Sequence, residues 1–394
     1  MKRLLLFLSA SCCIGSQASV ASDWPHWRGL DRDGRSPERI IEPLPEALEV
    51  LWRAQIGIGF SSFSVVDGRV YSMGNSDDVD TIWSLDAETG SVLWSVAYDC
   101  ELDPLYYEGG PGATPTVHQG SVYTLSKKGH VHRVEAKTGE VIWSRDLLAD
   151  HDLELPEWSF AGSPFVEDGR VILNAGRGGI ALSSETGETL WLPSKETSGY
   201  ATVVPFQGQH LLFSAKALLS LDPSSGEQAW ELPWKSSRDV NAADPLIVGE
   251  RLVVSSSGGS SMLSVENNQV TEIWQQPDMK WYFNPGVLVG DYIYCLHGTT
   301  HRPTELMCLD PENGEIVWTE PGFGSGGLIA AGDVLIVFDL GKLTLVRATP
   351  KGYERIHQQP ILEGKCWTAP VLAEGRIFCR NAAGDIAAVI LPTE

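Results

Sequence analysis

Short runs of β-type residues, each broken by a glycine, fill the chain from about residue 48 to its end. In VDGRVY (66–71) and HQGSVY (118–123), apolar residues stand on both sides of a glycine in a short polar turn, which is typical of a β-hairpin. The pattern occurs eight times, 39 to 52 residues apart, and this period suits units of four short strands. Since no segment after residue 21 keeps helical periodicity for more than about two turns, we predict an all-β fold.

A second motif alternates with these hairpins. In LDAETGSVLW (85–94), an acidic side chain starts a turn because its oxygen can accept a backbone N–H, and the glycine supplies a positive φ. Four residues later, on the returning strand, a tryptophan offers a large apolar face to a neighbouring unit. The tryptophans that stand in this predicted docking position are Trp94, Trp143, Trp191, Trp230, Trp274 and Trp318.

The numbers of the two motifs indicate how the units join. The hairpin glycine occurs eight times but the second motif seven times, and the chain ends before an eighth copy. At the other end, LEVLWRAQI (48–56) carries Trp52 without a turn before it. Pairing this strand with the last three strands would close a ring and remove exposed sheet edges. We therefore predict one eight-bladed β-propeller domain over residues 47–394, with residues 22–46 as a leader strap packed on the ring.

The repeated D-x-x-T-G-x-x-x-W resembles the tryptophan-docking repeat of pyrroloquinoline-quinone-type (PQQ-like) β-propellers. That family includes quinoprotein alcohol dehydrogenases and the outer-membrane β-barrel assembly lipoprotein, and the resemblance covers about residues 48–394. The resemblance is specific for the fold but says little about function, because both enzymes and scaffolds use this fold.

The enzyme interpretation can be compared with the resemblance residue by residue. Quinoprotein dehydrogenases of this fold are usually much longer, often carry a vicinal disulfide, and hold calcium through acidic and amide side chains beside a catalytic aspartate. Here the adjacent cysteines are Cys12 and Cys13, near the N-terminus, and no calcium set can be assigned to matching positions. We therefore expect no catalytic residues, no metal site and no cofactor, PQQ with calcium included. The length fits the assembly lipoprotein better, which implies a scaffold.

Charge and the N-terminus bear on location and partners. The formal net charge of −22 disfavours nucleic acid and anionic membrane surfaces as partners. Residues 1–21 begin with Lys2 and Arg3, continue with an apolar stretch and end in small residues, which is the layout of a signal peptide. We expect an exported, periplasmic or extracellular monomer without a transmembrane segment. Because Ser9 stands three positions before Cys12, we do not expect a lipid anchor there.

The candidate binding site follows from position. In a propeller, the residues just before each innermost strand gather around one mouth of the central channel, and here most blades contribute an aromatic side chain together with a few charges. Sugars, quinones or an extended peptide would fit such a mouth, and so would aromatic rings that merely fill the channel. The predicted mouth residues are Phe60, Tyr107, Glu108, Trp158, Tyr200, Arg238, Trp281, Tyr282, Phe323 and Trp367.

Three functional hypotheses remain. The leading one is a non-catalytic protein-interaction or ligand-binding scaffold in the cell envelope, and a carbohydrate-binding or hydrolytic propeller is the alternative. A PQQ-dependent oxidoreductase comes third. The five cysteines after residue 21 have no CxxC spacing, and we expect buried free thiols.

Overall fold

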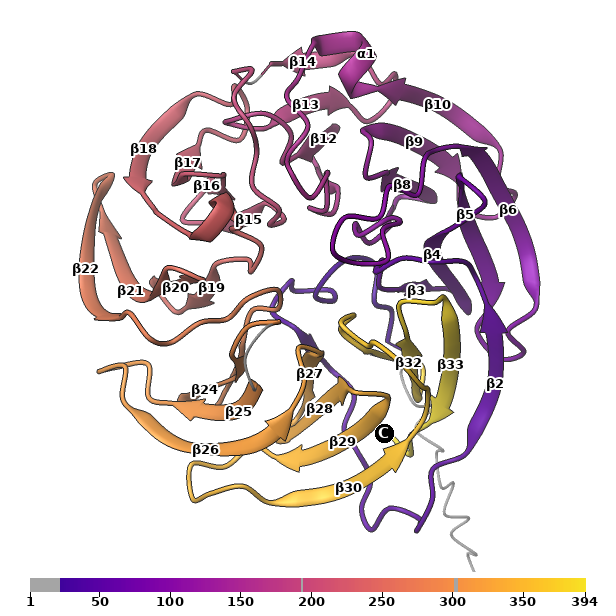
Figure 1. Ribbon diagram of the computed structural model, residues 1–394, viewed down its shortest axis with the longest axis vertical. Helices are drawn as coiled ribbons and strands as arrows, with labels where there is room; N and C mark the ends of the chain where they lie inside the picture. Colours follow the sequence, from indigo (N-terminus) through magenta and orange to yellow (C-terminus); the bar gives the residue numbers. More distant parts are fainter. Residues whose placement is uncertain (1–21, 193, 301–303) are drawn as a thin grey trace, which may run out of the picture.

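The computed structural model describes residues 22–192, 194–300 and 304–394, and the predicted signal peptide with Cys12 lies outside them. Within these residues the strands form eight sheets, arranged as blades around a common centre (Figure 1). Besides strands, this part of the chain holds the short helix α1 (Leu147–His151) and the 3-10 turn η1 (Ser237–Asp239). The prediction of an all-β, eight-bladed propeller is confirmed.

We number the blades 1 to 8 in chain order of their innermost strands. Blades 1 and 2 consist of β3 (Ser64–Val66), β4 (Arg69–Ser76), β5 (Val79–Asp86), β6 (Val92–Asp99), then β7 (Thr116–His118), β8 (Ser121–Leu125), β9 (His130–Glu135), β10 (Val141–Asp146). Blades 3 and 4 consist of β11 (Phe165–Glu167), β12 (Arg170–Leu173), β13 (Ile180–Ser183), β14 (Thr189–Trp191), then β15 (Val204–Phe206), β16 (Gln209–Phe213), β17 (Ala217–Leu221), β18 (Gln228–Pro233).

Blades 5 and 6 consist of β19 (Leu246–Val248), β20 (Arg251–Ser256), β21 (Gly259–Glu266), β22 (Gln269–Gln276), then β23 (Val287–Val289), β24 (Tyr292–His297), β25 (Thr304–Leu309), β26 (Ile316–Phe323). Blade 7 consists of β1 (Arg35–Ser36), β27 (Gly327–Ala331), β28 (Val334–Asp339), β29 (Lys342–Arg347) and β30 (Arg355–Pro360). Blade 8 consists of β31 (Val371–Ala373), β32 (Arg376–Arg380), β33 (Asp385–Ile390) and β2 (Val50–Gln55).

Neighbouring blades are joined at the outer rim by the predicted docking tryptophans. A Cβ atom placed on Gly90 of blade 1 would lie 2.6 Å from Cδ2 of Trp52, so the glycine is needed for close approach as well as for its φ of 71°. The indole Nε1 of Trp52 donates to the carbonyl oxygen of Ala87, 3.0 Å away. We call this contact between a tryptophan and the turn of the next blade a Trp–Gly joint. Apolar clusters between adjacent blades complete the core.

The junction of blade 8 with blade 1 brings the two ends of the sequence together. Strand β2 pairs antiparallel with β33, so the outer strand of blade 8 comes from the N-terminal part of the chain. Arg380, fully buried at the end of β32, donates to the carbonyl oxygens of Gly57, Ser61 and Met73, at 2.9, 2.8 and 2.6 Å. Burial lowers the pKa of Arg380 to about 9, and among the described residues no carboxylate pairs with it.

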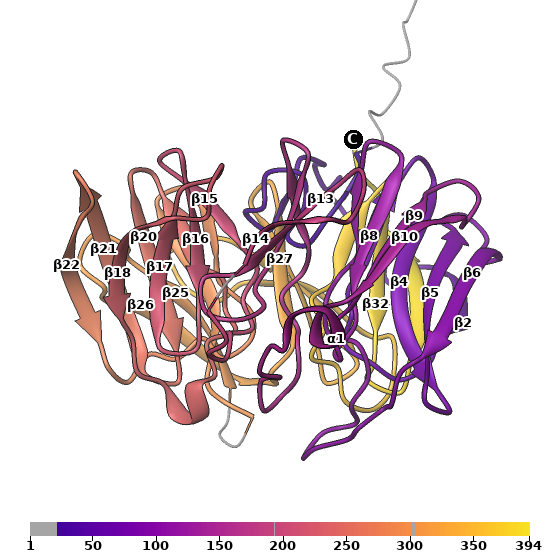
Figure 2. The same ribbon diagram turned by 90° about the horizontal axis from the view of Figure 1, so that it is seen from above.

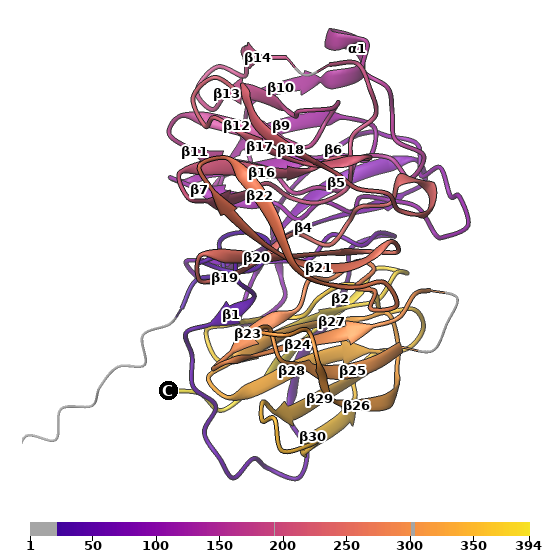
Figure 3. The ribbon, with the colours of Figure 1, turned by 90° about the vertical axis from the view of Figure 1, so that its left-hand side faces the viewer.

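The leader lies across the centre of the ring and ends beside the C-terminal residues, where Ile40 pairs with Thr393. Trp24 pairs with Val65 of β3, and further on β1 adds in parallel to β27, beside β23 (Figure 3). The C-terminal end lies on one face of the ring, whereas α1 lies on the opposite face (Figure 2).

Other features of the described residues concern cysteines and membranes. The five cysteines after residue 21 are free and buried, as predicted. No helix in the described ranges has the length and apolarity needed to cross a bilayer.

Candidate functional site at the channel mouth

The loops that lead into the innermost strands are tied together from blade to blade. In blades 1 to 4, the residue two positions before the innermost strand uses its backbone N–H to reach the side chain at the matching position of the next blade. Four such bonds run in series, from Ser62 to Thr114 (3.2 Å), Thr114 to Ser163 (2.9 Å), Ser163 to Thr202 (3.0 Å) and Thr202 to Asp244 (2.7 Å). All five side chains are buried, so the mouth loops start from a rigid inner ring.

The inner ring ends on a carboxylate that also holds the leader. Asp244 accepts the indole Nε1 of Trp27 at 2.7 Å. Burial raises the pKa of Asp244 to about 6, against the opposing effect of the nearby Arg28 guanidinium. Arg28 donates to the carbonyl oxygens of Asp33 (2.7 Å) and Gly286 (2.9 Å).

Protein side chains therefore fill this part of the channel. The cavity that remains beside Trp27 and Arg28 measures about 10 Å³, which is space for at most one water molecule. Any ligand of the mouth has to bind to its rim, because it cannot pass into the channel.

At the rim, aromatic rings from several blades form a continuous belt. The ring of Phe60 lies 5.6 Å from Tyr107 and 5.7 Å from Trp367, centroid to centroid. Tyr107 continues to Trp158 at 6.1 Å, and Trp367 continues in the other direction to Phe283 at 5.4 Å. We call these rings, together with Tyr106 and Tyr282 at the two ends, the aromatic belt. The separations are those of favourable aromatic pairs.

Two ion pairs flank the belt. Lys365 Nζ lies 2.8 Å from Glu108 Oε2 and 4.3 Å from the centroid of the Trp367 ring. Arg238 Nη1 lies 2.8 Å from Glu157 Oε1. Each cation is thus shared between a carboxylate and an aromatic face, which favours one orientation of the side chains. The belt presents ring surface with balanced charges at its edges.

A buried lysine positions the loop that carries Tyr106 and Tyr107. Lys127 is 2% exposed, and its ammonium donates to the carbonyl oxygens of Leu102 (2.9 Å) and Asp103 (2.7 Å). Burial lowers the pKa of Lys127, partly offset by the Asp103 carboxylate. The loop is therefore anchored at its start, although the Tyr106 ring itself is 80% exposed.

Most of the predicted mouth residues do meet in space. Five of them lie in the belt, Tyr200 adjoins it by accepting the Trp158 N–H on its hydroxyl at 3.3 Å, and two form the ion pairs. The members found in the belt or its ion pairs are Phe60, Tyr107, Trp158, Tyr282, Trp367, Glu108 and Arg238. Whether these residues bind a ligand stays a prediction.

Two predicted mouth residues lie elsewhere. Trp281 is fully buried in the apolar cluster between blades 5 and 6, and the belt position goes to Phe283. Phe323 packs against Tyr353, 6.2 Å away, in a separate inter-blade hollow. The sequence pattern placed both Trp281 and Tyr282 at the mouth, and of these two only Tyr282 lies in the belt.

Some residues of the mouth were not predicted from the sequence. Tyr106, Phe283, Lys127 and Lys365 all take part, and each stands beside or near a residue that was predicted. The sequence does contain a pattern that indicates the inner ring, because a serine, threonine or aspartate stands two residues before five successive inner strands.

The residues present do not fit calcium beside a quinone. In the described part of the chain no three His, Cys, Asp or Glu side chains gather to hold a metal ion. The two carboxylates at the belt, Glu108 and Glu157, are each engaged by a cation. We derive no chemical step through PQQ.

An eight-bladed ring with repeated Trp–Gly joints defines the class of PQQ-like β-propellers. Residues 80–320, more than half of the chain, match the family described as outer membrane protein assembly factor BamB, and the chain belongs to that family.

Individual relatives include both outer-membrane assembly factors and alcohol dehydrogenases. BamB of Burkholderia pseudomallei is 24% identical over 359 residues, which is 77% of this chain and 90% of that protein. The quinohemoprotein alcohol dehydrogenase ADH-IIG of Pseudomonas putida is 31% identical over 140 residues, 32% of this chain but only 18% of the enzyme. The chain therefore aligns with less than a fifth of that enzyme's length.

Solved structures agree on the fold. BamB of Moraxella catarrhalis superposes with a TM-score of 0.65 at 14% identity, covering 88% of this chain and 98% of that one. ADHIIG of Pseudomonas putida HK5 gives 0.70 at 15% identity, with 94% and 80% covered. At these identities the likeness concerns the fold alone.

Proposed function

We propose that this protein is an exported, non-catalytic scaffold of the cell envelope that binds a protein partner through the aromatic belt. The partner that we favour is a component of the machinery that assembles outer-membrane proteins. Membership of the BamB family supports this, as do BamB relatives that align over most of both chains. The role requires no cofactor.

The exposure of large side chains on one anchored loop supports the proposed location of the binding surface. Tyr106 is 80% exposed and its neighbour Leu105 is 37% exposed, on a loop that Lys127 anchors from below. Large side chains that remain exposed on a held loop lose little conformational freedom on binding, and tyrosine is among the residues that dominate interface energies. The ion pair of Arg238 with Glu157 beside Tyr106 provides the polar edge of such a contact.

A carbohydrate would need different features at the mouth. A hydrolytic pair requires one carboxyl free to give a proton and a second free to act as base or nucleophile. Glu108 and Glu157 are instead held by Lys365 and Arg238. This arrangement favours a binding surface over a hydrolytic one.

Site-specific photo-crosslinking in the native host tests the proposal. A photoreactive phenylalanine at position 106 should crosslink to an envelope protein of the assembly machinery. The same group at Lys137, an exposed turn residue of a Trp–Gly joint, should not. Because Tyr106 is mostly exposed, Tyr106→Ala should change the free energy of unfolding by less than about 0.5 kcal/mol while weakening the complex.

Two results would contradict the proposal. One is equal crosslinking from positions 106 and 137, or none from 106. The other is saturable, dye-linked alcohol oxidation by the purified chain after addition of PQQ and calcium, since that activity would make the protein an enzyme.

A further inference from the structure

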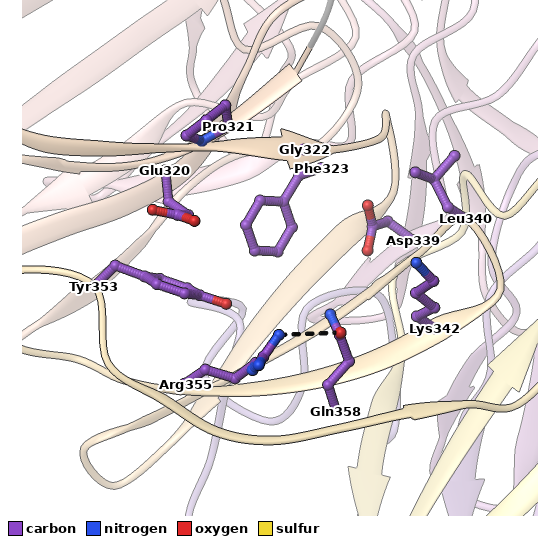
Figure 4. Close-up of a pocket in the computed structure, with 10 residues that line it drawn as sticks. All are labelled: Glu320, Pro321, Gly322, Phe323, Asp339, Leu340, Lys342, Tyr353, Arg355 and Gln358. Carbon is purple, nitrogen blue, oxygen red and sulfur yellow. Dashed lines mark hydrogen bonds between the residues drawn. The ribbon is translucent and has the colours of Figure 1, made fainter.

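A second hollow lies between blades 6 and 7, apart from the aromatic belt. The end of β26 forms one wall, and β28 to β30 with the turns between them form the other (Figure 4). Its volume is about 230 Å³, just below the roughly 300–1,000 Å³ of sites that take drug-sized ligands. An occupant would be a single small ring or a molecule of similar size.

Acidic, basic and amide side chains line this hollow together. Glu320 lies at one side and Asp339 at the other, with Arg355, Gln358 and Lys342 following one another between them (Figure 4). The two carboxylates and the two cations balance one another, so the hollow carries no net charge. A lining without net charge favours a neutral polar ligand over an ion.

Much of the bonding capacity in the hollow is unused. Within the described residues, the side chains of Glu320 and Lys342 and the hydroxyl of Tyr353 make no hydrogen bond or ion pair. Arg355 reaches Gln358 through one long bond of 3.3 Å. Polar groups that converge on a hollow without satisfying one another are available for bonds with a ligand.

One carboxyl is built into the wall. Asp339 is only 4% exposed, and one of its oxygens accepts the backbone N–H of Gly324. Burial raises the pKa of Asp339 while Lys342 opposes the shift. Whether ionised or protonated, this group can bond to a hydroxyl.

Aromatic surface completes the hollow. The ring of Phe323 projects into it, and the Tyr353 ring stands nearly perpendicular, at 81° and 6.2 Å (Figure 4). A phenyl face can pack against the apolar C–H face of a pyranose, while donors and acceptors bond to the hydroxyl groups around its edge.

We infer that this hollow binds a neutral sugar of one pyranose ring, with Phe323 under the ring and the side chains of Glu320, Lys342, Arg355 and Gln358 on its hydroxyl groups. The site is separate from the belt and does not depend on the partner proposed above. No bond of the sugar is made or broken there.

Ligand-observed NMR with the full-length protein tests the site. N-acetyl-D-glucosamine, D-glucose and D-galactose serve as probes, and at least one should show saturable binding. Phe323→Ala should weaken it at least tenfold. Lys342→Ala should weaken it severalfold, and this exposed side chain without a bonding partner is not needed for folding. Tyr106→Ala in the belt is the matched control and should leave sugar binding unchanged.

Three results would overturn the inference. The first is that none of the three sugars binds to the folded wild-type protein. The second is that Tyr106→Ala abolishes binding while Lys342→Ala does not, which would move the sugar to the belt. The third is that L-glutamine, a zwitterion of similar size, binds more tightly than every sugar, and that Phe323→Ala and Lys342→Ala weaken its binding.

Discussion

The outer rim and the central channel of this propeller hold the same eight blades by different chemistry. At the rim, one apolar contact with one hydrogen bond recurs from blade to blade, as in Trp52 with Ala87 and Trp274 with Pro311. In the channel, the leader is held by contacts that no other blade of the described chain repeats, from Trp27 to Asp244 and from Arg28 to Gly286. A repeated contact can be detected as a period in the sequence, whereas a unique one cannot.

The rim itself is not uniform. At four joints the ring atom nearest to the position of a glycine Cβ is Cδ2, but at Gly226 it is Nε1 of Trp191. The indole is turned there, and its Nε1 has no partner among the described residues. At the next junction Trp230 meets a turn with Val270 in the glycine position, and Asn267 and Asn268 provide the positive φ. The joint between blades 3 and 4 therefore lacks the indole hydrogen bond, and the joint between blades 4 and 5 lacks the glycine.

The strongest test of the rim uses two glycines with similar φ values. At Gly90 a new Cβ would overlap the buried Trp52 ring, whereas at Gly68 it would meet nothing within 4 Å. Gly90→Ala should lower the free energy of unfolding by about 2 to 4 kcal/mol, through strain and overpacking. Gly68→Ala should cost only the strain, about 1 to 2 kcal/mol. Urea unfolding measures both, and equal losses would mean that the joint is not tightly packed.

The channel can be tested through pH. Asp244 has a pKa of about 6 in the folded protein, against roughly 3.9 for an unperturbed aspartate, so the folded state holds this proton more tightly. The stability of the wild type relative to Asp244→Asn should therefore fall as pH rises from about 4 to about 6, by about 2 to 3 kcal/mol, and stay flat above. Unfolding in urea at several pH values measures the difference.

A rim carboxylate provides the matched control. Bonds from the hydroxyl and N–H groups of Ser224 and Ser225 lower the pKa of the exposed Asp222 to about 2. Its contribution is present above the unfolded pKa and is lost as pH falls toward 2, so the slope for Asp222→Asn should have the opposite sign. The same sign for both variants would contradict the contrast between rim and channel.

The smallest expected effect is a difference in stability loss between two of the joints. Trp52→Phe removes an indole N–H that donates to Ala87, whereas Trp191→Phe removes one that has no partner in the described chain. Trp52 is also the more buried of the two rings, so the lost hydrogen bond and the lost packing both make Trp52→Phe more destabilising than Trp191→Phe, by about 1 kcal/mol or more. Equal losses in chemical denaturation would show that the hydrogen bond is not what distinguishes the joints.

The repeat was sufficient to predict the number of blades and the docking tryptophans, because each joint uses the same residues at the same spacing. It also located the mouth, since position within a blade determines which loops meet. It failed for Trp281 and Phe323, where the direction of one side chain depends on a neighbouring blade rather than on the local pattern. Arg380 was missed for the same reason, since its acceptors lie more than 300 positions away in the sequence.

The buried guanidinium of Arg380 has a consequence for the order of folding. Its acceptors belong to blade 1, which is synthesised first, while the arginine itself arrives with the last blade. Contacts so distant in sequence pay the full entropy of loop closure before they contribute, and they slow folding. We therefore expect the earlier blades to form as an open arc, and the ring to become cooperative only when its final segment docks.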